Sequence, residues 1–250
     1  DLLSEAAAAF GIMEGRAAWD AAMAIDADDK RAAALGGALA GWLALDLEGA
    51  VEFATTGIEE GSFLDPGGRR FPDFAARLVG KVLAQHDFQQ ATAWVEALPA
   101  GPWRDGAIET AAETQLNEGW HRALAEASPD GGVDPTIFQE VQGREYAPVA
   151  EWLASLPRSK GRDEAATWLV FRLEDLDDPR LALQWAATIE DPRMHRIHFE
   201  RLARKLLPKS DTKAEDPEFD FKAWAAAHPA LAAELRQELK RTQAKEGNDE

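Results

Sequence analysis

The chain of 250 residues is 46% hydrophobic and carries a formal net charge of −18 at pH 7. This length and hydrophobic content are sufficient for one or two cores. The negative charge repels phosphate backbones and anionic lipid, so it argues against nucleic acid or a membrane surface as a partner and favours a neutral or basic protein. The absence of cysteine excludes disulfides, thiol catalysis and cysteine-ligated zinc.

The hydrophobic residues are mostly Ala, Leu and Trp, with few runs of Val, Ile or Thr. This composition favours helix over strand along nearly the whole chain and predicts an all-α fold.

No apolar run has the length needed to span a bilayer. Because the first residue is Asp1 and not Met, we expect a trimmed or processed product. The cellular compartment stays open, since a chain without cysteine fits reducing and oxidising environments equally.

The first two predicted helices cover residues 4–25 and 28–45. The first is expected to break near Gly11 or Gly15, because glycine is costly inside a helix. The second begins with acidic residues that complement the helix dipole. Its glycine pair at 36–37 also opposes helix formation, which predicts close packing against another helix at that point.

Each later repeat begins with an acidic residue that is followed, seven or eight positions later, by an aromatic residue. The acid falls at the start of a helix, where a carboxylate accepts backbone N–H groups and meets the positive end of the dipole, so we predict a structural cap. The aromatic follows small residues at helical spacing, which predicts a wedge between successive hairpins; a ligand-stacking platform is the alternative. The pairs are Asp46 with Phe53, Asp87 with Trp94, Glu145 with Trp152, Asp178 with Trp185 and, more loosely, Asp216 with Trp224.

These pairs divide the chain into tandem helical hairpins within a single predicted domain, residues 1–244. An insertion at 121–144 separates the third hairpin from the fourth. It is expected to continue the preceding helix, to turn at the Gly- and Pro-rich tip Ser128–Pro135 and to end in a short helical segment. A disordered tail is predicted for residues 245–250. The six hairpins are expected at about residues 4–45, 46–86, 87–120, 145–177, 178–208 and 216–244.

The aromatic positions are 34 residues apart from Trp19 to Phe53 and 33 residues apart from Trp152 to Trp185. This period resembles that of tetratricopeptide-like bacterial α-solenoids, which are built from tandem helical hairpins. The resemblance implies a right-handed α–α superhelix of about five to six hairpins and a tendency to bind proteins. It implies no site at the level of single residues.

Tryptophans outside the repeat phase are the predicted anchors of an exposed binding surface: Trp103, Trp120 and Trp168. Arg104 and Arg162 each lie ten residues after a phased tryptophan and begin the second helix of a hairpin. An Arg at that place opposes the helix dipole, so we expect a fixed carboxylate partner. An inter-repeat salt bridge and a ligand-binding Arg both fit this position.

Two further patterns could indicate a metal site or an enzyme. His195 and His198 lie three positions apart on a predicted helix and could face one metal ion, but no third ligand accompanies them at a useful spacing. The segments 26–29 and 175–178 match the DxDD signature of class II terpene cyclases, yet both coincide with turns that begin repeat helices. The sequence contains no nucleophile elbow, P-loop, dinucleotide fingerprint or zinc-protease motif. We therefore predict no catalytic residue, metal or cofactor.

The sequence predicts a non-enzymatic scaffold that binds a protein or peptide on the concave face of a helical-repeat solenoid. An enzyme on an α/α scaffold, or a small-ligand binder with an acid- and Trp-lined pocket, is the alternative. The excess of acidic residues favours a partner rich in Lys or Arg and predicts binding that weakens as salt rises. The oligomeric state stays open.

Overall fold

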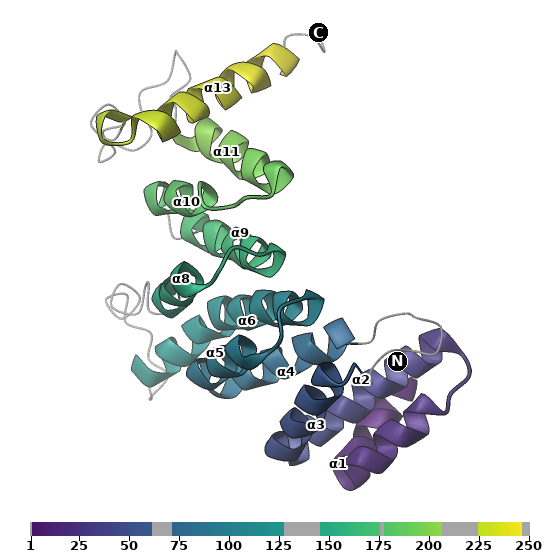
Figure 1. Ribbon diagram of the computed structural model, residues 1–250. Coiled ribbons are helices and arrows are strands. Elements are labelled where there is room, and N and C mark those ends of the chain that lie inside the picture. Colours follow the sequence, from purple (N-terminus) through teal and green to yellow (C-terminus); the bar gives the residue numbers. More distant parts are fainter. Residues whose placement is uncertain (1, 62–71, 128–145, 176–177, 207–224, 247–250) are drawn as a thin grey trace. The chain divides into compact units, whose positions relative to one another are not determined.

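The computed structural model of the chain describes residues 2–61, 72–127, 146–175, 178–206 and 225–246 (Figure 1). All regular secondary structure in these ranges is α-helical, which confirms the all-α prediction. The chain divides into two compact units, an N-terminal unit of residues 1–119 and a C-terminal unit of residues 120–250. The single repeat domain expected for residues 1–244 stays a prediction.

The helices of the N-terminal unit are α1 (Leu2–Met23), α2 (Asp28–Leu45), α3 (Leu47–Glu59), α4 (Pro72–His86), α5 (Phe88–Ala97) and α6 (Pro102–Ala127), of which α6 continues past the boundary of the unit. Helix α2 packs against α1, α3 and α4, and α4 packs in turn against α3 and α5. Helix α6 also lies against α4, where Arg77 forms an ion pair with Glu109 at 2.5 Å. Each helix therefore contacts neighbours that are close in the sequence.

The hairpin of α1 and α2 is held by direct contact between two backbones. Gly37 and Gly41, four positions apart on α2, both face α1. A Cβ atom on Gly37 would collide with the carbonyl oxygen of Ser4, and one on Gly41 with that of Ala8. The close packing predicted at residues 36–37 is therefore confirmed for Gly37, because no other residue type fits there without moving a backbone.

Helix α1 departs from helical geometry at Glu14 and Gly15, where Gly15 has a positive φ of 25°. The indole ring of Trp42 lies against Gly15 and leaves no room for a side chain. The break predicted in this helix thus falls at Gly15. Gly11 instead lies in the close contact with α2, against Ala38.

The helices described in the C-terminal unit, besides the end of α6, are α8 (Tyr146–Ser155), α9 (Lys160–Asp175), α10 (Pro179–Ala186), α11 (Pro192–Leu206) and α13 (Pro229–Glu246). Helix α9 packs against α8, α10 and α11, and α11 packs against α10 and α13 (Figure 1). Apolar residues at helical spacing on α9 and α11 are fully buried and form the core between them: Leu169, Val170, Leu173, Phe199 and Leu202.

Acidic residues cap α3, α5 and α10 at the positions that the sequence predicts for caps. Each carboxylate accepts a hydrogen bond, 2.8 to 3.1 Å long, from a backbone N–H two or three residues later. The cap thereby satisfies a donor of the first turn that has no partner within the helix. The capping residues are Asp46, Asp87 and Asp178, whereas Glu145 and Asp216 lie outside the described residues.

Phased aromatic residues join successive first helices of the N-terminal hairpins. Phe53 of α3 lies edge-on to Trp19 of α1, with ring centroids 5.3 Å apart. Trp94 of α5 donates from its indole nitrogen to the hydroxyl oxygen of Thr55 on α3, at 2.9 Å. Both contacts are of the kind that a wedge between hairpins requires.

In the C-terminal unit the phased aromatics differ in burial. Trp152 is buried, whereas Trp185 is only half-buried and its ring lies 6.0 Å from the guanidinium of Arg162. Trp185 is therefore only partly covered, and its role as a wedge stays a prediction. Trp224 lies outside the described residues.

Two helices extend beyond the predicted repeat boundaries. Helix α6 extends to Ala127, which confirms the helix expected at the start of the insertion, and residues 128–144 lie outside the described residues. Helix α13 ends at Glu246, so residues 245–246 of the expected tail are helical as well, and 247–250 lie outside the described residues.

Candidate functional site

Arg162 lies in the first turn of α9 and is buried, with 4% of its surface exposed. Its Nε donates to the carbonyl oxygen of Leu153 at 2.9 Å, and a terminal nitrogen donates to that of Thr188 at 3.4 Å. The carbonyl of Leu153 belongs to the last turn of α8, and that of Thr188 follows the end of α10. One guanidinium therefore joins two successive hairpins. Burial, together with repulsion by Arg158, lowers the pKa of Arg162.

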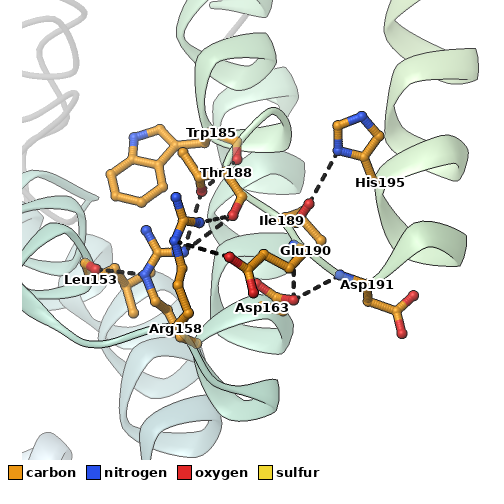
Figure 2. Close-up of polar contacts among 10 residues, drawn as sticks. Leu153, Arg158, Asp163, Trp185, Thr188, Ile189, Glu190, Asp191 and His195 are labelled. Carbon is orange, nitrogen blue, oxygen red and sulfur yellow. Dashed lines mark hydrogen bonds and ion pairs between the residues drawn. The ribbon is translucent and has the colours of Figure 1, made fainter.

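Asp163, the next residue, is also buried, with 6% of its surface exposed. Its Oδ2 accepts hydrogen bonds from the backbone N–H groups of Glu190 and Asp191, at 3.0 and 2.9 Å. Figure 2 shows the Asp163 carboxylate directed at this turn. Because the Asp191 carboxylate in turn caps the first N–H groups of α11, Asp163 fixes where α11 begins.

These contacts give Arg162 a structural role. The sequence leads us to expect a carboxylate as its hydrogen-bond partner, but the structure provides backbone carbonyls, since helix ends leave such oxygens without partners. The nearest acids, Asp163 and Glu190, act on Arg162 through charge alone. A side chain buried to this extent offers no surface to a ligand, so the binding role assigned to Arg162 from the sequence is not supported.

The other predicted binding residues are placed differently. Trp103 and Arg104 lie in the first turn of α6 and are both half-buried. Trp120 belongs to α6 as well, but its side chain is outside the described part. Trp168 of α9 is 37% exposed, the largest exposed fraction among the tryptophans whose side chains are described.

Trp168 belongs to a cluster that we call the outer face: Trp168, Phe171, Ile197 and Arg201. Trp168 and Phe171 meet edge-on on α9, with ring centroids 6.3 Å apart. The guanidinium of Arg201, on α11, lies 4.3 Å from the centroid of Phe171. Ile197, also on α11, is 46% exposed. The outer face thus combines aromatic, aliphatic and cationic surface on two adjacent helices.

Glu174 holds Arg201 in place over the aromatic ring. Its Oε2 accepts from Arg201 Nε at 2.7 Å and pairs with a terminal nitrogen of the same guanidinium at 2.6 Å. The Nζ of Lys205 donates to the backbone carbonyl of Glu174 at 3.2 Å. Arg201 is therefore held in place before any partner binds, which lowers the entropic cost of binding through this residue.

Helix α11 is strongly basic although the chain as a whole is acidic. Its sequence contains five basic residues and one acidic residue, a net charge of +4. Arg204 pairs with Glu200 at 2.9 Å, and Arg201 pairs with Glu174. Arg193 and Arg196 are exposed and form no ion pair with the described residues.

The two histidines of α11 face different neighbours. His198 is 1% exposed, and burial, followed by repulsion from Arg201 and His195, lowers its pKa to about 4. Its Nε2 lies 3.3 Å from Thr167 Oγ1, which itself donates to a backbone carbonyl. The Nε2 of His195 lies 2.7 Å from a carboxylate oxygen of Glu234 on α13. The two rings do not converge, and no group of three or more His, Asp or Glu suited to a metal ion occurs among the described residues.

Sequence reasoning identified Trp168 but missed the rest of the outer face. The signal was present, because Trp168 and Phe171 are three positions apart, and Ile197 and Arg201 four, so that each pair shares one side of a helix. The basic composition of α11 was hidden by the total charge of the chain.

None of the helices in the described residues is long and apolar enough to cross a bilayer. Comparison with protein-family models, curated proteins and solved structures finds no match to this chain.

Proposed function

We propose that the chain is a non-enzymatic scaffold of stacked helical hairpins, wound as a right-handed superhelix, that binds a protein or peptide on a face formed by one helix of each hairpin. The packing of α2 beside α4, and of α9 beside α11, supports the stacking, because these are the second helices of successive hairpins within each unit. Such stacks leave broad faces on which side chains can vary without disturbing the core.

The outer face of α9 and α11 carries the binding proposal. Trp and Arg are the residues most enriched at the energetic centres of protein interfaces. Single exposed apolar residues are common on protein surfaces, but here the exposed Trp168 contacts Phe171 on α9, and the exposed Ile197 lies on α11 one turn before the Arg201 that covers Phe171. Because Arg201 already lies over Phe171, a partner would meet an ordered surface.

Selection from a library of random peptides displayed on phage tests this proposal with the full-length chain as bait. We expect enriched peptides that bind the purified chain in solution. Replacing Trp168 and Ile197 together with Ala should weaken that binding by about tenfold or more, since both side chains supply exposed apolar contact area.

Met13→Ala is the matched control, because Met13 is 72% exposed but lies on α1 in the N-terminal unit. Its replacement should leave peptide binding unchanged. A selection that enriches no peptide would reject the peptide-binding scaffold, and turnover or tight binding of a small molecule would then identify the chain as an enzyme or a small-ligand binder.

A further inference from the structure

We infer that the segment bound by the outer face is an acidic peptide segment, with carboxylates on both sides of an apolar side chain. This inference rests on the proposed scaffold function and adds the chemistry of the partner to it. It reverses the basic partner that the total charge of the chain suggests, because the charge near the site has the opposite sign.

The charges of α11 are arranged around an apolar centre. Arg193, Ile197 and Arg204 are separated by four and seven positions, so they lie along one side of the helix, and all three are exposed. At 1.5 Å per residue, the two arginines are about 16 Å apart along the axis. Ile197 lies between them. A complementary segment therefore places an apolar side chain on Ile197 and carboxylates toward either end of α11.

The arginines of α11 that form no ion pair with the described residues lie near the start of the helix. Arg201 and Arg204 pair with acids of the same unit, whereas Arg193 and Arg196 form no ion pair with the described residues. Both are in the first two turns, where a cation opposes the helix dipole; the Asp191 carboxylate caps this end of α11 through backbone N–H groups, and the first turn itself contains no acid. Two arginines at this place work against helix stability. A carboxylate-bearing partner would supply the compensating charge and accept paired hydrogen bonds from each guanidinium.

A peptide fits these charges better than a nucleic acid does. At physiological ionic strength a charge acts over about 8 Å, so a few carboxylates sense mainly the arginines that they contact. A nucleic acid has a dense and extended row of phosphates. It would also meet the acids that alternate with the bases on this surface, Glu174 and Glu200, and the negative field of the whole chain.

The composition of the peptides enriched by the phage selection tests the inference. We expect them to contain Asp or Glu around Leu, Phe or Trp, and their binding to weaken as the salt concentration is raised. The double substitution Arg193→Glu and Arg196→Glu should weaken binding of an enriched peptide by about tenfold or more. Acids in the first turns favour the helix dipole, so this variant should fold, which circular dichroism and thermal unfolding check.

Lys30→Glu is the matched charge-reversal control, because Lys30 is an exposed base near the start of α2 in the N-terminal unit. It should leave peptide binding unchanged. A single-stranded oligonucleotide, labelled with the same fluorophore as the peptide, provides the competing measurement. It should bind more weakly than the acidic peptide.

The outcomes separate the two proposals. If no peptide is enriched, the scaffold function itself is wrong. If neutral or basic peptides are enriched, or if reversing Arg193 and Arg196 has no more effect than reversing Lys30, the function stands and the acidic partner is wrong. Tighter binding of the oligonucleotide than of any peptide would replace the acidic peptide by a nucleic acid.

Discussion

The two units of the chain stabilise their helix contacts by different means. In the N-terminal unit, α1 and α2 meet through glycines at which a side chain would strike the opposite backbone. In the C-terminal unit, successive hairpins are joined by buried polar groups. All ionisable side chains that are buried in the described residues, Arg162, Asp163, His198 and Glu238, belong to this unit. One interface is specific through shape, the other through hydrogen bonds and charge.

Two equivalent dipeptides, one in each unit, show this difference more clearly. Arg104 and Asp105 begin α6 in the same way that Arg162 and Asp163 begin α9, ten residues after a phased tryptophan. The first two are half-buried and the second two are buried. Helix α9 has 16 residues and is followed by α10 and α11, and the turn between these two helices supplies the N–H groups that bind Asp163. Helix α6, by contrast, has 26 residues. The same Arg-Asp dipeptide is thus buried and hydrogen-bonded only where the following hairpin packs against it.

Replacing Asp163 with Ala should produce the largest effect. The change leaves two partly buried backbone N–H groups without a charged acceptor, which should cost about 4 kcal/mol at roughly 1.5–3 kcal/mol for each bond. The matched change Asp105→Ala removes a half-buried side chain in the first turn of α6 and should cost less than about 1 kcal/mol. Urea denaturation, with hydrogen exchange of the segment 146–206 to locate the effect, measures both.

Asp163→Asn provides the control for charge, because an amide oxygen can accept the same two hydrogen bonds. It should cost less than the change to Ala. Equal losses for Asp163→Ala and Asp105→Ala would show that the two positions are equivalent and that the contrast between the hairpins is wrong.

Gly37→Ala tests the shape-based interface of the N-terminal unit. A Cβ at this position meets the backbone of Ser4, which cannot move aside as a side chain can, so we expect a loss of about 3 kcal/mol. The adjacent change Gly36→Ala meets the end of the Phe74 ring at 2.8 Å, and Phe74 is exposed. There the gain in helix propensity, up to about 1 kcal/mol, should offset the shift of the ring.

Thermal unfolding of the two variants and the unmodified chain gives this comparison directly. A destabilisation of the same size at both glycines would mean that general helix packing, and not backbone contact at Gly37, holds α1 against α2.

His198 makes the C-terminal unit sensitive to pH. Its pKa is about 6.5 in an unfolded chain and about 4 in the folded one, so between these values the unfolded chain binds a proton that the folded chain does not. The free energy of unfolding should therefore decrease as the pH falls from 6.5 towards 4. Between pH 7 and pH 5 the loss from this residue should be about 2 kcal/mol.

The variant His198→Leu isolates this contribution from that of the many carboxylates. Urea denaturation of both proteins at pH 7 and pH 5 should show a smaller loss in the variant by about that amount. Identical pH dependence in the two proteins would mean that folding does not lower the pKa of His198.

The helices and their caps could be predicted from the sequence because their signals are local. Asp46, Asp87 and Asp178 each lie beside the N–H groups that they bind, and the glycine pair at 36–37 is anomalous within its own helix. The contacts of Arg162 and the composition of the outer face could not be predicted in the same way. They depend on residues 26 to 30 positions away, such as Thr188 and Glu174. Only the packing of α9 on α10 and α11 brings those residues together.

Acidic residues cap helices in both units, and replacing one of them should give the smallest loss of stability. Asp87 in the N-terminal unit accepts from the N–H groups of two residues and Asp178 in the C-terminal unit from one, and each change to Ala should cost about 1 kcal/mol. Changes to Asn should restore most of the loss, because the amide oxygen can accept the same hydrogen bonds. Thermal unfolding of the four variants measures this. Because these caps are exposed or half-buried, the two Ala variants should agree within about 0.5 kcal/mol. A much larger loss at Asp178 would show that the cap is coupled to the buried polar contacts around Asp163, and that the C-terminal unit responds as one cooperative network.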